Sequence, residues 1–342
     1  MNLPETQRQI VLAKRPVGLP DPDTFAASAG PIPDIGEGQI LVEVELISLD
    51  PAMRSWLDDR PSYIPPVQIG EVMRAIGIGR VVASNVDRFA PGDRVSGMMG
   101  WQEYAVFDAK GLQPVPPGAS SELALGPLGM TGMTAYFGLL DIGDPKPGET
   151  VLVSGAAGAV GSLVGQIAKI KGCRVVGTAG TDEKCRWLTE ELGFDAAVNY
   201  KTAERLSTAI KAACPDGVDV YFDNVGGPLL DVALTRLNRK ARVVICGAIS
   251  LYNATSRPKG PSNYMALLVK RARMEGFVVF DYVRQYGEAV AAMNGWIEEG
   301  RIQVRYDVVD GLENASSALL TLFSGANTGK LMVRVSSSGK RP

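Results

Sequence analysis

Three glycines in the middle of this 342-residue chain have the spacing expected where a backbone approaches a phosphate. Gly155, Gly158 and Gly161 follow the apolar run Val151–Val153, and a helical stretch and a second apolar run, Arg174–Gly177, come after them. A strand, a tight glycine turn, a helix and a second strand predict a dinucleotide-binding βαβ unit, whose pyrophosphate lies at the helix N-terminus. The glycines alone would also fit a tight turn in any α/β protein. Their order within about thirty residues favours the nucleotide site.

The end of the second apolar run indicates which dinucleotide would bind. A site that prefers NAD ends this strand with Asp or Glu, which holds the ribose 2′-hydroxyl. Here the strand ends at Thr178-Ala179-Gly180, and Asp182 and Glu183 follow where they would cap and start the next helix. Lys184, in the first turn of that helix, could reach a 2′-phosphate, and the alternative is a solvated lysine on the helix surface. We therefore predict NADPH as the cofactor.

The complete absence of histidine restricts the chemistry of the chain. Acid–base catalysis by histidine, a Ser-His-Asp triad and imidazole metal ligands are all excluded. The cysteines are dispersed without CxxC spacing, so we predict no metal site and no disulfide. We expect buried or half-buried thiols, as in a reducing compartment, at Cys173, Cys185, Cys214 and Cys246.

Composition narrows the range of partners. A formal net charge of −2 gives no reason to expect nucleic acid or an anionic membrane as a partner. No apolar run approaches the roughly 20 residues of a membrane span, and the start of the chain lacks the apolar core of a signal peptide. We therefore expect a soluble cytoplasmic protein. The length and the 46% apolar content suggest two or three domains with sizeable cores.

The elements that must position the glycine loop lie between about residues 148 and 279, where apolar runs and helical patterns alternate. Helices are expected at 184–192 and 229–237, after a helix within 123–140 that leads into this region. Strands in βα alternation predict a doubly wound parallel sheet of the Rossmann type. The expected strands are Thr150–Ser154, Arg174–Thr178, Ala196–Asn199, Val218–Asp223, Arg242–Gly247 and Arg273–Val279.

The residues before position 123 have a different pattern, of short strands separated by Pro and Gly turns. Strands are expected at Gln39–Ser48 and Ile76–Ala83, with a turn at Pro91-Gly92 before the next strand. This pattern predicts a mostly β, barrel-like domain rather than a second βαβ array.

The C-terminal part is expected to return to this first domain. Helices are predicted within 286–300 and 313–323, followed by a closing strand, Lys330–Val335, and a frayed tail over 336–342. We therefore predict a mostly β domain formed by residues 1–122 and 305–342. The nucleotide domain, residues 123–304, would be inserted into it.

Six motifs in order along the chain resemble the zinc-independent medium-chain dehydrogenase/reductases. Within that family the resemblance is to the branch of prostaglandin reductase, leukotriene B4 12-hydroxydehydrogenase, 2-alkenal (double-bond) reductase and curcumin reductase, and it covers nearly the whole chain. The motifs are Asp50-Pro-Ala-Met-Arg54, the segment 128–136, Ala156–Gly161, Phe222–Gly227, Cys246–Asn253 and Arg273–Val279.

The resemblance implies a GroES-like domain beside the Rossmann domain, and homodimers. The implied activity is NADPH-dependent reduction of the carbon–carbon double bond of α,β-unsaturated aldehydes and ketones. Two positions depart from the family pattern: Ala52 stands where tyrosine is usual and Thr131 where proline is usual. Both are expected near the substrate, so the preferred enone or enal stays open, as do the direction of the reaction and its stereochemistry.

The resemblance also implies cofactor contacts outside the glycine loop. Tyr200 would lie beside the 2′-phosphate or adenosine, and the alternative is an amphipathic surface tyrosine. Asn224 follows a strand at a carboxyl edge suited to the nicotinamide half, and the alternative is an Asx turn. Asn327 would make a contact from the C-terminal segment, or form a loop turn. The full predicted set is Gly155, Gly158, Ala159, Val160, Gly161, Thr178, Gly180, Lys184, Tyr200, Asn224, Cys246, Gly247, Ala248, Ile249, Ser250, Phe277, Val278, Val279 and Asn327, of which Phe277–Val279 would equally suit a core strand.

Alkene reduction requires a hydride at the β-carbon, stabilisation of the enolate oxygen and a proton at the α-carbon. Without histidine or an expected metal, the donors that remain are Tyr, Lys, Arg, ribose hydroxyls and water. Tyr252 is the catalytic candidate, because it follows a strand end and the resemblance places the matching tyrosine by the nicotinamide ribose. A packing tyrosine in a loop is the alternative. Candidate substrate-pocket residues are Tyr63, Met130, Tyr264 and Arg54, of which Arg54 would either orient the Asp50 loop or form a surface ion pair.

Two other functions stay open at this point. An NADPH quinone oxidoreductase of the same superfamily would use the same cofactor site, and a cofactor-binding protein with little turnover would need no Tyr252. A zinc alcohol dehydrogenase is disfavoured, since its ligands cannot be assembled here. For the expected homodimer, an exposed strand near Leu251 or Phe280 could pair across the interface.

Overall fold

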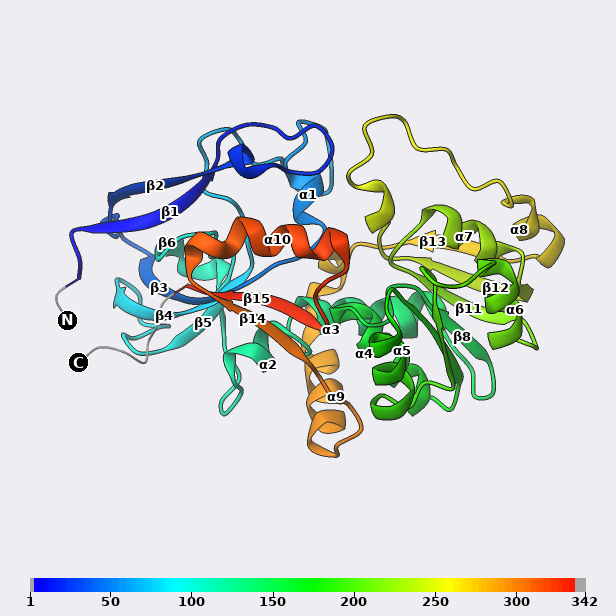
Figure 1. Ribbon diagram of the computed structural model, residues 1–342. Coiled ribbons are helices and arrows are strands. Elements are labelled where there is room, and N and C mark those ends of the chain that lie inside the picture. Colours follow the sequence, from blue (N-terminus) through cyan, green and yellow to red (C-terminus); the bar gives the residue numbers. More distant parts are fainter. Residues whose placement is uncertain (1–2, 336–342) are drawn as a thin grey trace. The chain divides into compact units, whose positions relative to one another are not determined.

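The computed structural model describes residues 3–335, which form two compact units (Figure 1). Unit 1 contains the residues up to Leu125 and those from Tyr306 onward, and unit 2 is Gly126–Arg305. The predicted divisions, after residues 122 and 304, lie close to these. The tail expected over 336–342 lies outside the described residues. Within residues 3–335, no helix is long and apolar enough to cross a membrane.

Unit 1 is built around β3, a long strand buried along most of its length. β3 pairs antiparallel with β4, β6 and β15, in a sheet ordered β14-β15-β3-β4-β5-β7, and β1 pairs with β2 in a separate ribbon. The return of the C-terminus to this mostly β unit is therefore confirmed. The strands are β1 (Thr6–Leu12), β2 (Phe25–Pro31), β3 (Gln39–Ser48), β4 (Gly77–Ser84), β5 (Arg94–Gly97), β6 (Tyr104–Asp108), β7 (Gln113–Pro114), β14 (Tyr306–Asp310) and β15 (Lys330–Arg334), and the helices are α1 (Met53–Trp56), α2 (Ser121–Leu125) and α10 (Ala315–Ser324).

Unit 2 is a six-stranded parallel sheet with the order β10-β9-β8-β11-β12-β13. Successive strands extend the sheet from β8 through β9 to β10 on one side, and from β11 through β12 to β13 on the other. This strand order confirms the predicted doubly wound Rossmann fold. Ligands of such sheets bind where the strand order reverses, here between the carboxyl ends of β8 and β11. The strands are β8 (Thr150–Val153), β9 (Arg174–Ala179), β10 (Ala196–Asn199), β11 (Val218–Asp223), β12 (Leu237–Ile245) and β13 (Arg273–Gly276).

Helices cover both faces of this sheet, because alternate side chains of each strand point to opposite sides. On one face Leu152, Val176 and Tyr221 pack with residues of α6, α7 and α8. On the other, Gly177 lies against Leu188 and other residues near α4 and α5. The helices are α3 (Met130–Phe137), α4 (Ala159–Ile170), α5 (Asp182–Arg186), α6 (Leu206–Ala213), α7 (Gly227–Leu234), α8 (Met265–Lys270) and α9 (Tyr286–Glu298).

Several predicted boundaries were wrong. The helix expected within 123–140 is two helices, because the segment around Pro127 folds back so closely that a Cβ on Gly132 would lie 1.7 Å from the Pro127 carbonyl oxygen. β13 ends at Gly276 rather than Val279, and α5 passes at Arg186 into π-helical turns. The helix expected to 237 ends at Leu234, because Leu237 already pairs in β12.

The strand expected near Leu251 or Phe280 was also wrong. Both residues lie in 3₁₀ turns, Ile249–Leu251 and Val279–Gln285, and the strand at that edge of the unit 2 sheet is β13.

Candidate functional site

The glycine loop lies at the reversal of strand order in unit 2. β8 ends at Val153, and Gly155 then adopts φ +57°, a left-handed conformation that glycine takes without strain. The Ala156 N–H donates to the Thr178 carbonyl at 3.0 Å, which ties the loop to the end of β9. Gly158 is the N-cap of α4.

The loop passes so close to α4 that Gly161 has no room for a side chain. A Cβ on Gly161 would lie 2.4 Å from the Gly155 carbonyl oxygen and 2.8 Å from the Ala156 Cα. The first N–H groups of α4 have no intrahelical acceptor, and they carry the positive end of the helix dipole. A loop without obstructing side chains at the start of a twelve-residue helix suits a pyrophosphate.

The segments that follow β9 and β10 carry three more predicted residues. A Cβ on Gly180 would lie 3.0 Å from the Tyr200 hydroxyl oxygen, so this phenol covers the glycine backbone. Lys184 lies in the first turn of α5, where its N–H donates to the capping Thr181 Oγ1 at 3.2 Å. The Asp182 carboxylate accepts a 2.7 Å hydrogen bond from Asn199 Nδ2. The carboxylate nearest to the end of β9 is thereby engaged within the protein, which suits a 2′-phosphate better than a 2′-hydroxyl.

Asn224 faces the glycine loop from the carboxyl end of β11. Its Nδ2 donates to the Ser154 carbonyl at 2.7 Å, and its backbone N–H donates to Ser154 Oγ at 2.8 Å. Thr178, by contrast, is fully buried at the end of β9, and its hydroxyl has no hydrogen-bond partner among the described residues. The structure therefore groups Asn224 with the glycine loop and places the Thr178 side chain inside the sheet's packing.

Tyr252 lies against the backbone that follows β12. Its hydroxyl accepts a hydrogen bond from the Ala248 N–H at 3.3 Å, and a Cβ on Gly247 would lie 2.9 Å from the same oxygen. The segment before it is bound to the end of β11, since Ile249 N–H donates to the Asn224 carbonyl at 3.2 Å. Ser250 Oγ donates to the Val225 carbonyl at 2.6 Å. Tyr252, residues 246–250 and Asn224 thus form one connected group.

Two aromatic side chains, those of Phe277 and Tyr286, fix the segment Phe277–Val279. A Cβ on Gly138 would lie 2.5 Å from the Phe277 ring, so the ring occupies the space that this glycine leaves. Tyr286 donates to the Val279 carbonyl at 3.0 Å and contacts Met130 Sδ at 3.6 Å. Burial raises the pKa of Tyr286 to about 12, so its hydroxyl stays protonated and remains a donor. Met130 and the predicted carboxamide-binding segment therefore share one anchoring residue.

The remaining predicted residues occupy separate positions. Arg54 is buried in unit 1, where it donates to the Gly18 carbonyl at 2.9 Å and to Asp58 Oδ1 at 2.8 Å, so it organises the local chain. Asn327 donates to the Gly329 carbonyl at 3.2 Å in a turn. Tyr63 in unit 1 and Tyr264 at the start of α8 in unit 2 are exposed. Their roles toward a substrate or cofactor stay predictions.

Two polar residues at the centre of this site, Ser154 and Asp223, were missed from the sequence. Both are buried at the carboxyl ends of β8 and β11, and their side chains are joined by a 2.9 Å hydrogen bond. The available signal was a carboxylate directly after the apolar run Val220–Phe222 and before Asn224. Its importance depends on the pairing of β8 with β11, which the local sequence does not display.

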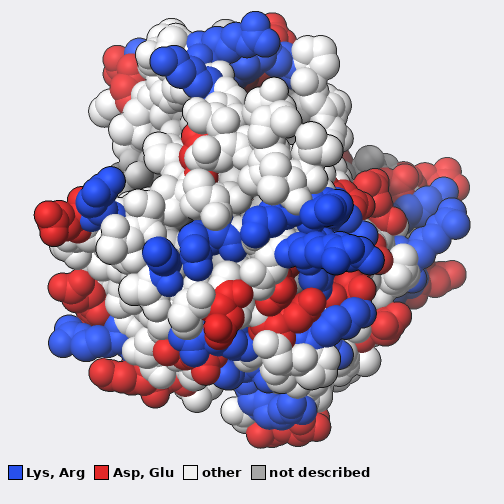
Figure 2. Space-filling model, turned by 90° about the vertical axis from the view of Figure 1, so that its right-hand side faces the viewer, with Lys and Arg blue, Asp and Glu red and all other residues white. Residues whose placement is uncertain are grey.

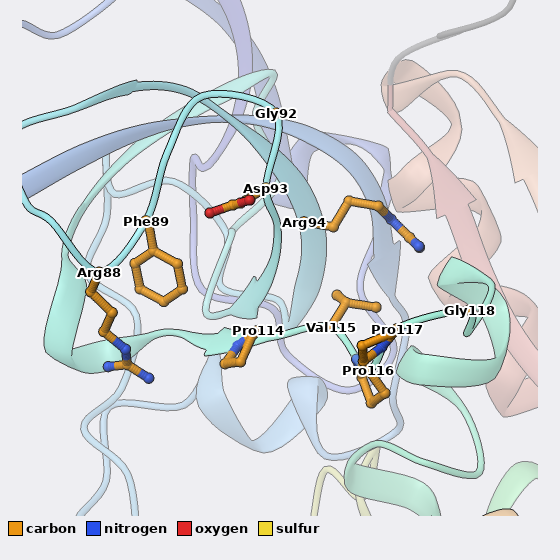
Figure 3. A pocket seen from close by; sticks show the side chains of 10 residues that line it. All are labelled: Arg88, Phe89, Gly92, Asp93, Arg94, Pro114, Val115, Pro116, Pro117 and Gly118. Atoms are coloured by element: carbon orange, nitrogen blue, oxygen red, sulfur yellow. The ribbon is translucent and has the colours of Figure 1, made fainter.

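A cavity in unit 1 is separate from these groups (Figure 3). It has a volume of about 560 Å³, and none of the predicted site residues lines it. The guanidinium of Arg88 donates to backbone carbonyls, and that of Arg94 donates to the Ala119 carbonyl and Ser121 Oγ. The lining is Arg88, Phe89, Gly92, Asp93, Arg94, Pro114, Val115, Pro116, Pro117 and Gly118.

Comparisons with known proteins cover nearly the whole chain. Residues 8–115 match the family described as N-terminal domain of oxidoreductase, and residues 159–295 match the zinc-binding dehydrogenase family. The chain is 45% identical to the NADPH-dependent curcumin reductase of Escherichia coli over 341 residues, with 97% of each chain covered. It is 43% identical to the NADP⁺-dependent 2-alkenal reductase of Nicotiana tabacum over 306 residues, with 88% of each covered. The crystal structure of CurA from Vibrio vulnificus in complex with NADPH has a TM-score of 0.92 at 44% identity, covering 98% of this chain and 100% of that one.

The region that matches the zinc-binding family offers few groups to a metal. Within residues 3–335, no group of three or more His, Cys, Asp or Glu side chains is arranged to hold a metal ion. Burial raises the pKa of the Cys173 and Cys214 thiols to about 11, and burial and then the Asp223 carboxylate raise that of Cys246 to about 12. Zinc binds thiolates, so these thiols are weak candidates for ligands.

Proposed function

The chain belongs to the zinc-independent branch of the medium-chain dehydrogenase/reductases, and on that premise we propose that it reduces the carbon–carbon double bond of α,β-unsaturated ketones and aldehydes with NADPH. The observation that carries the proposal is the meeting of the glycine loop, Asn224 and the Tyr252 segment at the strand-order reversal of unit 2. Such a reversal is where doubly wound sheets bind dinucleotides.

The residues of unit 2 fit NADPH along its length. The glycine loop and the start of α4 would hold the pyrophosphate, and Gly180, Lys184 and Tyr200 would surround the 2′-phosphate. Asn224 and the backbone of 246–250 and 277–279 would line the nicotinamide half. When bound, the cofactor supplies the hydride that reaches the β-carbon.

Tyr252 would stabilise the substrate oxygen that becomes the enolate. Its hydroxyl is fixed against the Gly247–Ala248 backbone, where it would hydrogen-bond the carbonyl oxygen of the substrate or the ribose hydroxyl beside it. A hydrogen bond to that oxygen strengthens as enolate charge develops, and this differential stabilisation lowers the barrier. The proton that the α-carbon needs would arrive through Tyr252, the ribose hydroxyl or water.

Replacement of Tyr252 by Phe tests this role. We expect kcat for an enone to fall about 100-fold, the size typical of one lost donor to an oxyanion, while the Kd for NADPH stays unchanged. Tyr306→Phe, in β14 of unit 1, is the matched control and should retain wild-type kcat. Equal kcat in the Tyr252→Phe and wild-type enzymes would remove Tyr252 from the mechanism.

A substrate panel separates the proposed reaction from its alternatives. NADPH oxidation should be fastest with enals, cyclic enones or long-chain enones, and the product should carry a saturated carbon–carbon bond. Faster oxidation with a quinone would instead identify a quinone reductase. Failure to oxidise NADPH with any member of the panel would indicate a binding protein with little turnover.

We also propose a homodimer formed along the outer edge of unit 2. β13 ends the sheet, and the nearby α8 exposes Leu268 and Val269 at 70% and 62% of their full surface. The face drawn in Figure 2, which includes α8, has a broad uncharged area beside a band of Lys and Arg. An unpaired edge strand with adjacent apolar side chains can pair with a second copy. Light scattering after gel filtration should give twice the chain mass, and a monomer mass would refute the dimer.

We also propose that the protein is located in the cytoplasm. Cys173, Cys185, Cys214 and Cys246 are all unpaired in the structure, as expected in a reducing compartment. Fractionation of cells that express the tagged chain should recover it in the cytosolic fraction, and recovery with membranes or medium would contradict this location.

A further inference from the structure

We propose that Asp223 is a positioning residue that holds together the loops at the nicotinamide end of the cofactor site. This inference rests on the proposed function. Asp223 is 1% exposed at the carboxyl end of β11, beneath the loops that follow β8, β11 and β12. Buried carboxylates are costly unless they are well hydrogen-bonded, so the partners of Asp223 show what its burial maintains.

One oxygen of this carboxylate collects donors from several directions. Asp223 Oδ1 accepts from Ser154 Oγ at 2.9 Å, from Tyr221 Oη at 2.8 Å, and from the N–H groups of Val225 and Gly226 at 2.9 Å each. Burial, and then the carboxylate itself, raise the pKa of Tyr221 well above its ordinary value, so the phenol remains a donor. Hydrogen bonds to a charged acceptor are about twice as strong as neutral ones.

These donors and the Asp223 backbone belong to three different loops. Ser154 directly precedes the left-handed Gly155 of the glycine loop, and Val225 and Gly226 form the turn that leads into α7. The Asp223 carbonyl accepts from the N–H groups of Cys246 and Gly247 at 2.9 and 3.0 Å, at the start of the segment that carries Tyr252. A single residue thus fixes the relative positions of the glycine loop, the Asn224 turn and the Tyr252 segment.

The 2′-phosphate end of the site is built without Asp223. Gly180 and Tyr200 lie at the ends of β9 and β10, and Lys184 is placed by the Thr181 cap of α5. A change at Asp223 should therefore disturb the nicotinamide end and leave the adenosine end intact. A substitution that merely destabilised the fold would weaken both ends together.

The test compares two ligands in Asp223→Asn. Asparagine keeps one acceptor oxygen, but it removes the charge and puts amide hydrogens where Asp223 Oδ2 has no partner among the described residues. We expect its Kd for 2′,5′-ADP, measured by calorimetry, to stay within about twofold of wild type. We expect kcat for an enone to fall about 10- to 100-fold and the fluorescence of bound NADPH to change, because the loops around the nicotinamide shift.

Two further variants complete the experiment. Tyr306→Phe, the control used above, removes a phenol hydroxyl in β14 of unit 1 and none of the donors to Asp223, so kcat, 2′,5′-ADP affinity and NADPH fluorescence should all match wild type. Ser154→Ala keeps Asp223 but removes the bond from Ser154 Oγ to its carboxylate, together with the acceptor of the Asn224 N–H. If Asp223→Asn fails to fold, Ser154→Ala should show the same difference between the two ligands in a weaker form.

The two possible failures can be told apart. Wild-type kcat and fluorescence in Asp223→Asn, or parallel losses of 2′,5′-ADP and NADPH affinity in the variants, would overturn the positioning role. Inactivity of the wild-type enzyme toward enones would overturn the proposed function instead, while the comparison of 2′,5′-ADP affinity with NADPH fluorescence would still test Asp223.

Discussion

We propose that single side chains at the ends of β9 and β10 set the preference of the site for NADPH. The sequence predicts NADPH because no Asp or Glu stands at the end of β9. The structure adds that the Asp182 carboxylate accepts a hydrogen bond from Asn199. Lys184 lies in the first turn of α5, and Lys201 is a second lysine beside the predicted 2′-phosphate position, with its Cε 3.2 Å from where a Cβ on Gly180 would lie. Selectivity for NADPH should therefore depend on Lys184.

Lys184→Ala should raise the KM for NADPH about 10- to 100-fold, because a hydrogen bond to a charged group contributes about 1.5–3 kcal/mol. The KM for NADH should not change, since NADH has no 2′-phosphate. Steady-state kinetics with each cofactor would measure both values. Lys211→Ala, at an exposed position of α6, is the control and should behave as wild type. Equal increases of KM for both cofactors would show that Lys184 does not recognise the phosphate.

Residue-level prediction from the sequence was possible where the signal was local and was not possible where it depended on strand pairing. The glycine series and the missing acid can be read from neighbouring residues. Asp223 could not be identified in this way, since its partners Ser154 and Gly247 reach it through the pairing of β11 with β8 and β12. The structural role of Arg54 could not be predicted for a similar reason, because its buried hydrogen-bond partner Gly18 is distant in the sequence.

At the level of elements, the contact between the glycine loop and α4 sets how closely the backbone approaches a phosphate. Gly161 makes that contact, and its neighbours are backbone atoms that cannot move aside as a side chain would. Gly295 in α9 is also a helical glycine, but a Cβ there would meet nothing within 4 Å. Comparison of alanine substitutions at Gly161 and Gly295 therefore separates the effect of steric clash with the loop from the effect of replacing a helical glycine.

Gly161→Ala should lower the free energy of unfolding by about 1–3 kcal/mol, as overpacking typically does, and should greatly weaken NADPH binding. Gly295→Ala should stabilise the protein by about 0.5–1 kcal/mol, because alanine loses less entropy in a helix, and should leave NADPH affinity unchanged. Chemical denaturation and calorimetric titration would provide both quantities. Tight NADPH binding by Gly161→Ala would mean that the loop does not need its observed geometry.

The strands of unit 2 were predictable because most of them contain short runs of buried apolar residues, as in β8 and β9, which is typical of parallel strands covered on both faces. Their ends were less predictable. β12 starts at Leu237 because it pairs there with Val218 of β11, and β13 is cut short where Phe277 leaves the sheet to fill the space at Gly138. Both boundaries are set by contacts from distant parts of the chain.

At the scale of the whole molecule, strands from the N-terminal and C-terminal parts of the chain pair within unit 1. Lys330 of β15 is buried and donates to Asp50 Oδ1 at 2.6 Å and to the Leu49 carbonyl at 3.1 Å, just after β3. The strand pattern near the C-terminus predicted the return to the first domain. The ion pair that accompanies it joins residues 280 positions apart, and no local pattern reports such a contact.

Carboxylates that accept hydrogen bonds in the folded state give the molecule a predictable response to acid. Burial opposes ionisation of Asp195, but the Val175 N–H at 2.7 Å and Lys169 Nζ at 2.9 Å outweigh it, and the pKa of Asp195 is lowered. Burial likewise opposes ionisation of Glu149, and hydrogen bonds, chiefly from Arg242, lower its pKa. A carboxyl whose pKa is lower in the folded state stabilises the fold above its ordinary pKa, and this contribution is lost as the pH falls through the folded-state value.

Unit 2 should therefore keep a constant stability down to about pH 5 and lose stability progressively below about pH 4, where unfolded Asp and Glu take up protons first. Calorimetric thermal unfolding between pH 3 and pH 7 would measure this loss, because tryptophan fluorescence reports on both units, from Trp187 and Trp296 in unit 2 and from Trp56 and Trp101 in unit 1. Asp195→Asn should be less stable than wild type at pH 7 and should lose less stability between pH 5 and pH 3, because it can no longer be protonated. An acid loss of the same size in this variant would show that Asp195 is not among the groups whose protonation unfolds the protein.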